Sequence, residues 1–166
     1  DFAIHKAIFA ALGQASRRIW ITTPYFVPDD AILTALITAS LRKVDVRVIV
    51  PRKSDSKLVD LAARSYFPEL LAAGVRLFEY GPRFVHAKTL VIDDDIAMVG
   101  TANLDNRSFR LNFELMAIAY DRVLTEALAR AFEADLGHCQ PIAKKGRLKF
   151  SRRLGEAGAR LLSPLL

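Results

Sequence analysis

Residues 85–114 read VHAKTLVIDDDIAMVGTANLDNRSFRLNFE and combine strand-like apolar runs with polar side chains that are costly to bury without partners. The segment HAKTLVI is typical of a β-strand, on which His86 and Lys88 point to one face because they are two positions apart. The aspartate run at 93–95 is typical of a tight turn. The stretch therefore predicts a β-hairpin that carries a histidine and a lysine on one face.

The second strand of this hairpin brings further polar groups to the histidine. A turn of two or three residues pairs Lys88 with Val99 or Gly100, and it places the histidine opposite Thr101 or the residue after it. Gly100 has no side chain, so another group can approach the backbone closely beside the lysine. Thr101 and Asn103 are then expected next to the histidine.

A later strand, NFELMAIAY at residues 112–120, puts Asn112 and Glu114 on one face, from which Glu114 can reach the same pocket. The set suits phosphoryl transfer through a covalent intermediate, in which an imidazole nitrogen attacks phosphorus. Ammonium, amide and hydroxyl groups hold the non-bridging oxygens, and a carboxylate bonded to the other ring nitrogen fixes the tautomer. The lysine can do electrostatic work that Mg²⁺ does in other phosphoryl-transfer enzymes.

Each residue also has a structural explanation. A single histidine is more often a core or surface residue, and Glu114 alone could pair with an arginine. The aspartate run is more typical of a turn than of a metal site, because nothing near it supplies the other ligands that a hard cation needs. We therefore expect no metal and no cofactor. The combination at fixed spacing is what favours a catalytic role.

The rest of the chain alternates helix and strand patterns. Helices are expected at residues 2–16, 28–43, 54–74 and 121–138, and strands at 17–23, 44–51 and 75–80. Ser54 is the expected cap of its helix, and Pro68 is expected to kink or split it. This alternation over the first eighty residues predicts βαβ units and a parallel core sheet.

Composition limits the class of protein. The 166 residues are expected to form one globular domain, and with a single cysteine no internal disulfide is possible. No apolar run is long enough to span a bilayer. The net charge of +6 lies in residues 141–166, so the neutral remainder argues against a broad nucleic-acid-binding face. That basic tail is either a surface for anionic lipid or phosphate, or a solvated amphipathic segment.

The spacing His86-x-Lys88-x4-Asp93-x6-Gly100-Thr101-x-Asn103 resembles the HKD motif of the phospholipase D superfamily. The segments LDNRSFRLNFE, TPYFVPDD and RSYFPELLAAGVRLFEY resemble bacterial cardiolipin synthases, and the likeness covers nearly the whole chain. One departure is mild, since threonine stands at position 101 where the family often has serine.

The resemblance implies a role for each motif position. His86 would be one of two catalytic histidines, and Glu114 would hydrogen-bond it. Phosphate binding would fall to Lys88, Asn103 and Thr101. Asp93 belongs to the catalytic signature, but it sits on the turn with opposite strand parity, so we expect a structural or indirect role for it.

The resemblance also implies a fold and a partner. The expected fold is a phospholipase D-like α/β/α sandwich with a mixed, largely parallel central sheet and helices on both faces. Residues 1–140 would form a catalytic half-domain with one HKD motif, and residues 141–166 a basic amphipathic tail. Family enzymes place two such motifs face to face, so the partner is a second half from the same parent chain or a second copy. An isolated half is expected either to expose apolar surface or to self-associate.

Three functions remain open from the sequence. The first is the C-terminal half of a cardiolipin synthase, which joins two phosphatidylglycerols and releases glycerol through a phosphohistidine intermediate. The parent would act at the cytoplasmic face of the bacterial inner membrane, and this fragment itself is expected to be soluble. The absent initiator methionine fits a segment of a longer protein. The second is another phosphodiesterase, phosphatidyltransferase or nuclease completed by homodimerisation. The third is an isolated half-domain without activity.

Overall fold

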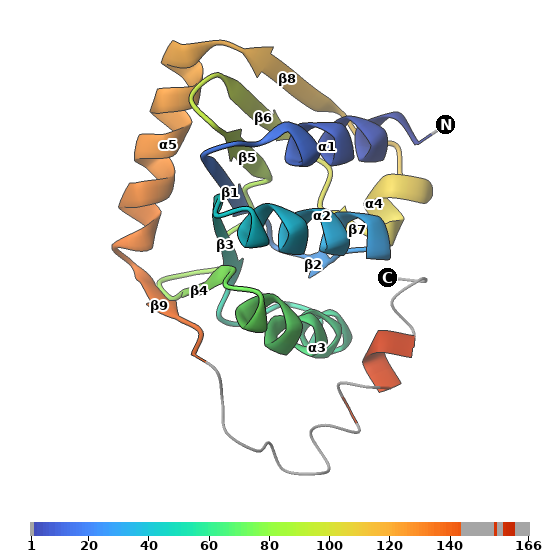
Figure 1. The fold of residues 1–166 in the computed structure, drawn as a ribbon. Helices are drawn as coiled ribbons and strands as arrows, with labels where there is room; N and C mark the ends of the chain where they lie inside the picture. Colours follow the sequence, from blue (N-terminus) through green and yellow to red (C-terminus); the bar gives the residue numbers. More distant parts are fainter. Residues whose placement is uncertain (1, 144–154, 156–157, 162–166) are drawn as a thin grey trace.

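A seven-stranded sheet runs through the computed structural model, which describes residues 2–143, 155 and 158–161 (Figure 1). Its strands follow the order β8-β6-β5-β1-β3-β4-β9. The bounds are β1 Arg18–Thr22, β3 Asp45–Pro51, β4 Arg76–Tyr80, β5 Thr89–Ile92, β6 Ile96–Gly100, β8 Met116–Tyr120 and β9 Cys139–Pro141. A separate pair of short strands, β2 (Phe26–Val27) and β7 (Leu104–Asp105), runs in parallel.

Helices cover both faces of the large sheet, as expected for an α/β/α sandwich (Figure 1). The longer helices are α1 (Ala3–Gln14), α2 (Asp30–Leu41), α3 (Lys57–Ala72) and α5 (Arg122–Leu136), and α4 (Asn106–Arg110) is short. The first three pack on one face over a large apolar core. α5 packs on the other face, where Phe132 stacks on Trp20 at 5.2 Å between ring centroids.

The sheet is mixed, but the expectation that it is largely parallel is wrong. Within the described part of the seven-stranded sheet, β1–β3 and β3–β4 pair in parallel, whereas β1–β5, β5–β6, β6–β8 and β4–β9 are antiparallel. Parallel neighbours need a crossover, which α2 and α3 provide in the first half of the chain. After β4, no long helix in the described part of the chain joins one strand to its neighbour in the sheet. These neighbouring strands therefore pair in the antiparallel sense.

The expected N-cap of α3 is wrong, and of the two alternatives for Pro68, a kink or a split, the structure excludes the split. Its N-cap is Ser56, whose hydroxyl accepts from the Val59 amide at 3.4 Å, and the predicted cap Ser54 lies two residues earlier. Pro68 does not split the helix, which continues to Ala72. The apolar side chains around the proline are buried against the core, and this packing offsets the lost backbone hydrogen bond.

One edge of the sheet gathers the polar motif. Four strands end at this edge, namely β1, β3, β4 and β6, and two strands begin at it, namely β5 and β8. Four segments therefore meet at this edge: the connection after β1, the connection after β3, residues 81–88 and residues 101–115. Among the described residues no helix is long and apolar enough to cross a membrane.

Candidate active site

The histidine and lysine of the motif lie directly before β5, which begins only at Thr89, so the predicted strand is shorter than HAKTLVI. The pairing nevertheless continues, because the Gly100 amide donates to the Lys88 carbonyl at 3.2 Å. Lys88 therefore lies opposite Gly100, which confirms the three-residue alternative for the turn. The His86 side chain is exposed, whereas Lys88 is only 8% exposed.

Lys88 reaches the histidine ring. Its Nζ donates to His86 Nε2 at 2.9 Å and to the His86 carbonyl at 2.9 Å. Burial lowers the pKa of Lys88 below its ordinary value, although the carboxylates of Glu114 and Asp105 act in the opposite direction. A lysine ammonium can only donate, so we assign Nε2 as the acceptor. The ring therefore presents a lone pair, the form that a nucleophile or a general base requires.

Asn103 is buried beside the site and held by the short helix α4. Its backbone N–H and its Nδ2 donate to Ser108 Oγ at 3.0 and 3.2 Å. Asp105 caps the helix, because its carboxylate accepts from the Ser108 amide at 2.7 Å. Asn103 Oδ1 is buried, and it has no hydrogen-bond partner within the part of the chain that the structure describes. Its side-chain amide is thus fixed at one end and unpaired at the other.

Glu114 belongs to the same hydrogen-bond network. Its Oε1 accepts from Ser108 Oγ at 3.4 Å and from Asn112 Nδ2 at 3.1 Å. Its charge adds to the raised pKa of Asp105, and it opposes the lowering of the Lys88 pKa by burial. The structure thus brings Glu114 to the predicted site, while its hydrogen bond to His86 stays a prediction.

The segment that carries Glu114 is held close to β6 at Gly100 and Thr101. Thr101 N donates to the Leu115 carbonyl at 2.9 Å, and the Leu115 amide donates to Thr101 Oγ1 at 3.0 Å. A side chain at Gly100 would overlap the Leu115 carbonyl and lie 2.8 Å from Met116 Cα. The predicted close approach at this glycine is therefore confirmed, and the approaching group is backbone. Thr101 as a phosphate ligand stays a prediction.

Asp93 lies at the opposite end of β5 from Lys88. Its carboxylate accepts from the amides of Ser16, Arg17 and Arg18 at 2.7–3.2 Å and from Ser16 Oγ at 2.9 Å. Partial burial alone would raise the pKa of Asp93, but the backbone hydrogen bonds hold it below its ordinary value. These contacts tie the hairpin turn to the start of β1, which favours a structural role for this motif position.

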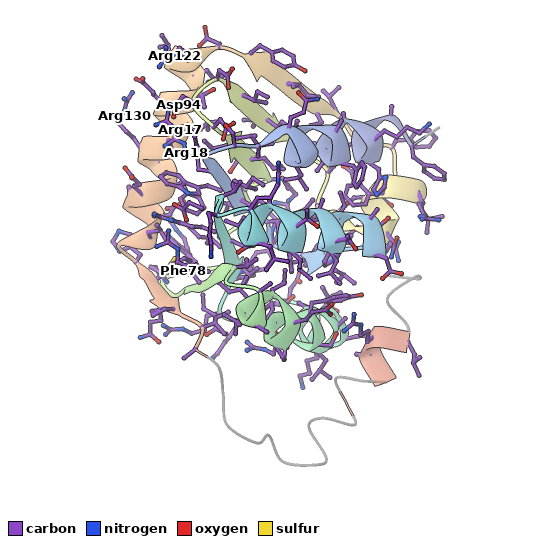
Figure 2. The ribbon with its side chains drawn as sticks, viewed as in Figure 1. Arg17, Arg18, Phe78, Asp94, Arg122 and Arg130 are labelled. Atoms are coloured by element: carbon purple, nitrogen blue, oxygen red, sulfur yellow. The ribbon has the colours of Figure 1, made fainter. Side chains whose placement is uncertain are left out.

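Ion pairs reinforce the same turn. Arg17 and Arg18 both pair with Asp94, the Arg18 contact at 3.2 Å, and Figure 2 shows the three residues together beside α5. Asp93 also has a positive φ of 50°, a backbone conformation that aspartate tolerates better than most residues. The whole arrangement is distant from the histidine.

Sequence reasoning missed Asp105 and Ser108. Asp105 is 5% exposed, and burial raises its pKa, an effect that Glu114 adds to and the hydrogen bonds from Ser108 oppose. Asp105 is the N-cap of a helix of five residues and Ser108 is the third residue of that helix, which is too short to show an apolar period. The signal that could have found it is an aspartate followed three residues later by a serine whose hydroxyl can turn inward.

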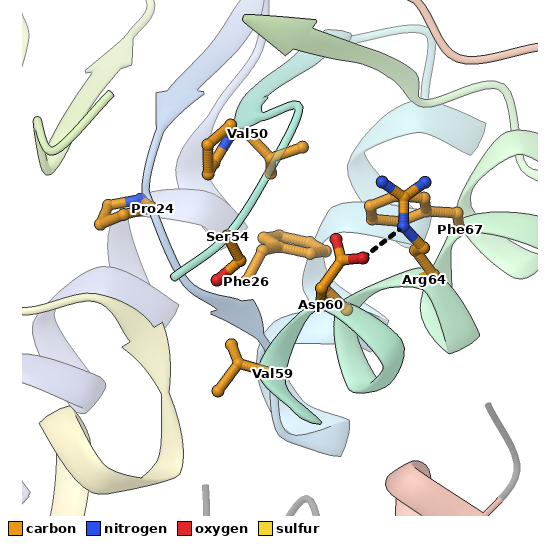
Figure 3. A pocket seen from close by; sticks show the side chains of 10 residues that line it. Pro24, Phe26, Val50, Ser54, Val59, Asp60, Arg64 and Phe67 are labelled. Carbon is orange, nitrogen blue, oxygen red and sulfur yellow. Dashed lines mark hydrogen bonds and ion pairs between the residues drawn. The ribbon is translucent and has the colours of Figure 1, made fainter. Parts of the chain in front are cut away.

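A small pocket lies between strand β2, the end of β3 and helix α3 (Figure 3). Its lining is mostly apolar and contains none of the motif residues. Arg64 at its edge is held by Asp60 and Glu79, each at 2.9 Å. No group of three potential metal ligands occurs among the described residues. The motif residues, and not this pocket, define the candidate site.

An exposed apolar segment borders the site. Leu111, Phe113 and Leu115 are 67%, 107% and 74% exposed, and they alternate with Asn112 and Glu114. The segment leads directly into β8, which is an edge strand among the described residues. Exposed apolar surface, one of the two alternatives expected of an unpaired half, is therefore present next to the HKD motif.

Solved structures share this architecture. Nuc of Salmonella typhimurium, a phospholipase D family member, superposes with a TM-score of 0.75 at 19% identity, over 84% of this chain and 91% of that one. Phosphatidylserine synthase of Haemophilus influenzae gives a TM-score of 0.74 at 17% identity, over 99% of this chain and 45% of that one. The fold is thus that of a phospholipase D-like domain, in agreement with the HKD spacing.

The family follows from closer matches. The chain belongs to the family described as cardiolipin synthase, PLD-like domain, whose model matches residues 8–136. It is 47% identical over 165 residues to the cardiolipin synthase of Geobacillus thermodenitrificans, covering 98% of this chain and 33% of that protein. The chain spans about a third of the length of the curated relatives it matches.

Proposed function

We propose that this chain is the C-terminal catalytic half of a cardiolipin synthase, which transfers a phosphatidyl group between two phosphatidylglycerols and releases glycerol. One observation carries the proposal: exposed His86 has its Nε2 held at 2.9 Å by buried Lys88, in a chain whose family is that of cardiolipin synthases. The reaction would take place at the cytoplasmic face of the bacterial inner membrane, where the parent protein meets its phospholipids.

The proposed chemistry uses two histidines. The first attacks phosphorus through its ring nitrogen, a P–N bond forms, and the bond from phosphorus to the glycerol oxygen breaks. The second protonates that oxygen, then removes the proton from the hydroxyl of another phosphatidylglycerol, whose oxygen attacks phosphorus and breaks the P–N bond. His86 takes one of these roles, and a second motif supplies the other.

The other side chains act on the phosphate. When a phosphodiester enters, Lys88 Nζ turns from His86 Nε2 to a non-bridging oxygen, which frees the ring nitrogen and neutralises charge. Asn103 Nδ2 donates one hydrogen to Ser108, and its second hydrogen is the one that donates to the phosphate. Glu114 holds the other ring nitrogen of His86. Asn103 is preorganised by its hydrogen bonds to Ser108 of α4, so this donor needs little reorganisation during the reaction.

A second half completes the site in this proposal. The described residues contain one HKD motif, and His86 is exposed rather than enclosed. We place the second half against Leu111, Phe113 and Leu115, because burying these side chains would also close the site from water. The relatives are about three times as long as this chain, which leaves room for such a half in one polypeptide.

A phosphodiesterase completed by homodimerisation is the second candidate. It is favoured by the Nuc structure, because this chain covers 91% of Nuc and thus matches a protein of similar size. The balanced charge of residues 1–140 argues against nucleic acid as the substrate. In this case two copies of His86 would serve one site.

The test is His86→Ala in the full natural chain, with phosphatidyl transfer measured on phosphatidylglycerol vesicles. We expect transfer to fall to the background rate, because one of the two essential histidines is lost. His138→Ala is the matched control, since His138 is also exposed but lies after α5 beside Tyr80. Transfer that persists in His86→Ala would refute the proposed function.

A further inference from the structure

Tyr25 and Asp55 form a hydrogen-bonded pair at the sheet edge that holds the motif. Tyr25 lies in the connection between β1 and β2, and Asp55 lies between β3 and α3. The Tyr25 hydroxyl donates to the Asp55 carboxylate, with distances of 2.9 and 2.7 Å to its two oxygens. Asp55 is exposed and Tyr25 is half-buried. The pair therefore faces solvent at this edge, where a ligand can reach it.

Aromatic rings connect this pair to the histidine. The Tyr25 ring lies 6.3 Å from the Phe84 ring, and the Phe84 ring lies 5.8 Å from the His86 ring, measured between centroids. Phe84 is 37% exposed although it is a large apolar side chain. Tyr25, Phe84 and His86 thus line one continuous wall, which we call the aromatic wall.

The Asp105 carboxylate acts on both Tyr25 and Lys88. It adds to the raised pKa of Tyr25, and it opposes the lowering of the Lys88 pKa by burial. Burial, followed by the hydrogen bond to Asp55, raises the pKa of Tyr25 to about 12. The Tyr25 hydroxyl is therefore neutral and remains a donor to Asp55 throughout the physiological range.

The two ends of the aromatic wall suit different parts of a substrate. The Lys88 end carries a cation and suits a phosphate. At the other end, the carboxylate of Asp55 accepts hydrogen bonds and repels a phosphate, while the phenol oxygen of Tyr25 keeps a free lone pair. Acceptors beside an exposed phenyl ring suit a ligand with several hydroxyls on a short carbon chain.

We propose that Tyr25, Asp55 and Phe84 bind the polyol headgroup of the alcohol that accepts the phosphatidyl group. The inference rests on the proposed function and deepens it by assigning the acceptor site. Asp55 accepts hydrogen bonds from the polyol hydroxyls, Tyr25 orients that carboxylate, and Phe84 packs against the carbon chain between them and His86. The aromatic wall thereby selects a polyhydric alcohol over a monohydric one.

The experiment measures acceptor choice in the full natural chain on phosphatidylglycerol vesicles. Glycerol and 1-propanol are supplied as competing acceptors in one reaction, with the glycerol carrying an isotopic label, and phosphatidylpropanol, labelled phosphatidylglycerol and the hydrolysis product are counted. We compare wild type with Tyr25→Phe and Asp55→Asn. Tyr120→Phe is the matched control, because Tyr120 lies at the far end of β8, opposite Ile96.

Asp55→Asn is expected to lower the ratio of glycerol to propanol transfer about tenfold, the factor that one net hydrogen bond supplies. Tyr25→Phe is expected to lower it about threefold, because it frees the carboxylate without removing it. Thermal unfolding of each variant shows whether the pair only braces two loops. An unchanged ratio in both variants, whatever their stability, would overturn the acceptor site.

The two proposals fail in different ways. If wild type transfers the phosphatidyl group to glycerol but the ratio of glycerol to propanol transfer is unchanged in both variants, only the acceptor site is wrong. If wild type transfers to no alcohol at all, the proposed function is wrong, and the acceptor site falls with it.

Discussion

Replacing Asp93 tests whether this motif position is structural. Asp93→Ala removes the acceptor for three backbone amides and one hydroxyl, those of Ser16, Arg17 and Arg18, which tie the β5–β6 turn to β1. It also forces alanine into a backbone with φ of 50°. If the role is structural, the change lowers stability and leaves the turnover of the folded protein nearly unchanged.

The magnitude follows from these contacts. The amides lie near the surface and regain water, so each lost bond costs about 1 kcal/mol, and the strained backbone adds about 1 kcal/mol. Asp93→Ala should therefore lower the free energy of unfolding by about 5 kcal/mol, or about 15 °C in Tm for a domain of this size. Asp93→Asn keeps one oxygen and tolerates the positive φ, so about half of that loss is expected.

The loss of stability in Asp93→Ala is expected to be larger at neutral pH than at acidic pH. The folded-state pKa of Asp93 lies below its unfolded value. Its carboxylate therefore stabilises the fold above the unfolded pKa of about 4, and the contribution is lost as pH falls through the folded pKa. The stability difference between wild type and Asp93→Ala should be full at pH 7 and should shrink below about pH 4.

The assay is urea unfolding at pH 7 and at pH 3, with phosphatidyl transfer measured on the same preparations of the full chain. Asp95→Ala is the control, because Asp95 is exposed in the same turn, and it should change stability by less than about 0.5 kcal/mol. A stable Asp93→Ala protein that has lost transfer would refute the structural role.

Three further predictions concern the site. Gly100→Ala should destabilise the fold by about 3 kcal/mol and reduce transfer, because the added methyl group overlaps the Leu115 backbone; urea unfolding and initial rates measure both effects. Ser108→Ala should lower transfer about tenfold while costing about 1–2 kcal/mol, since the Asn103 amide loses its anchor; an unchanged rate would contradict the positioning. Phe113→Asp should leave the Tm of this chain within about 2 °C, because the side chain is fully exposed. In the full chain the same change should abolish transfer, and full activity would show that the second half does not pack there.

Part of the site could be predicted because spacing determines strand register. The interval between Lys88 and Gly100 leaves two choices of turn, and the structure selects the three-residue one. The place of Asp93 away from the histidine follows from parity along the strand, since it is five residues beyond Lys88. The need for a glycine at position 100 also follows from the sequence, although the group that approaches it does not.

The remainder depends on long-range contacts that spacing does not encode. The alternation of helix and strand in the first half predicts parallel pairing, but β5 joins β1 in the antiparallel sense, and nothing local to either strand determines that choice. Ser108 and Asp105 act through a helix of one turn. Tyr25 contacts Asp55 because the connections after β1 and β3 meet at one edge. The basic tail lies largely outside the described residues, and its binding to anionic lipid stays a prediction.

The most direct test of the central claim is the molar mass of this chain in solution, measured by light scattering on a size-exclusion column with phosphodiesterase activity assayed across the peak. A site made of two halves predicts that the monomer is inactive, and that any activity follows a species containing a second motif. A monomer of this chain that hydrolyses phosphodiesters would contradict the account, because one copy of His86 would then suffice.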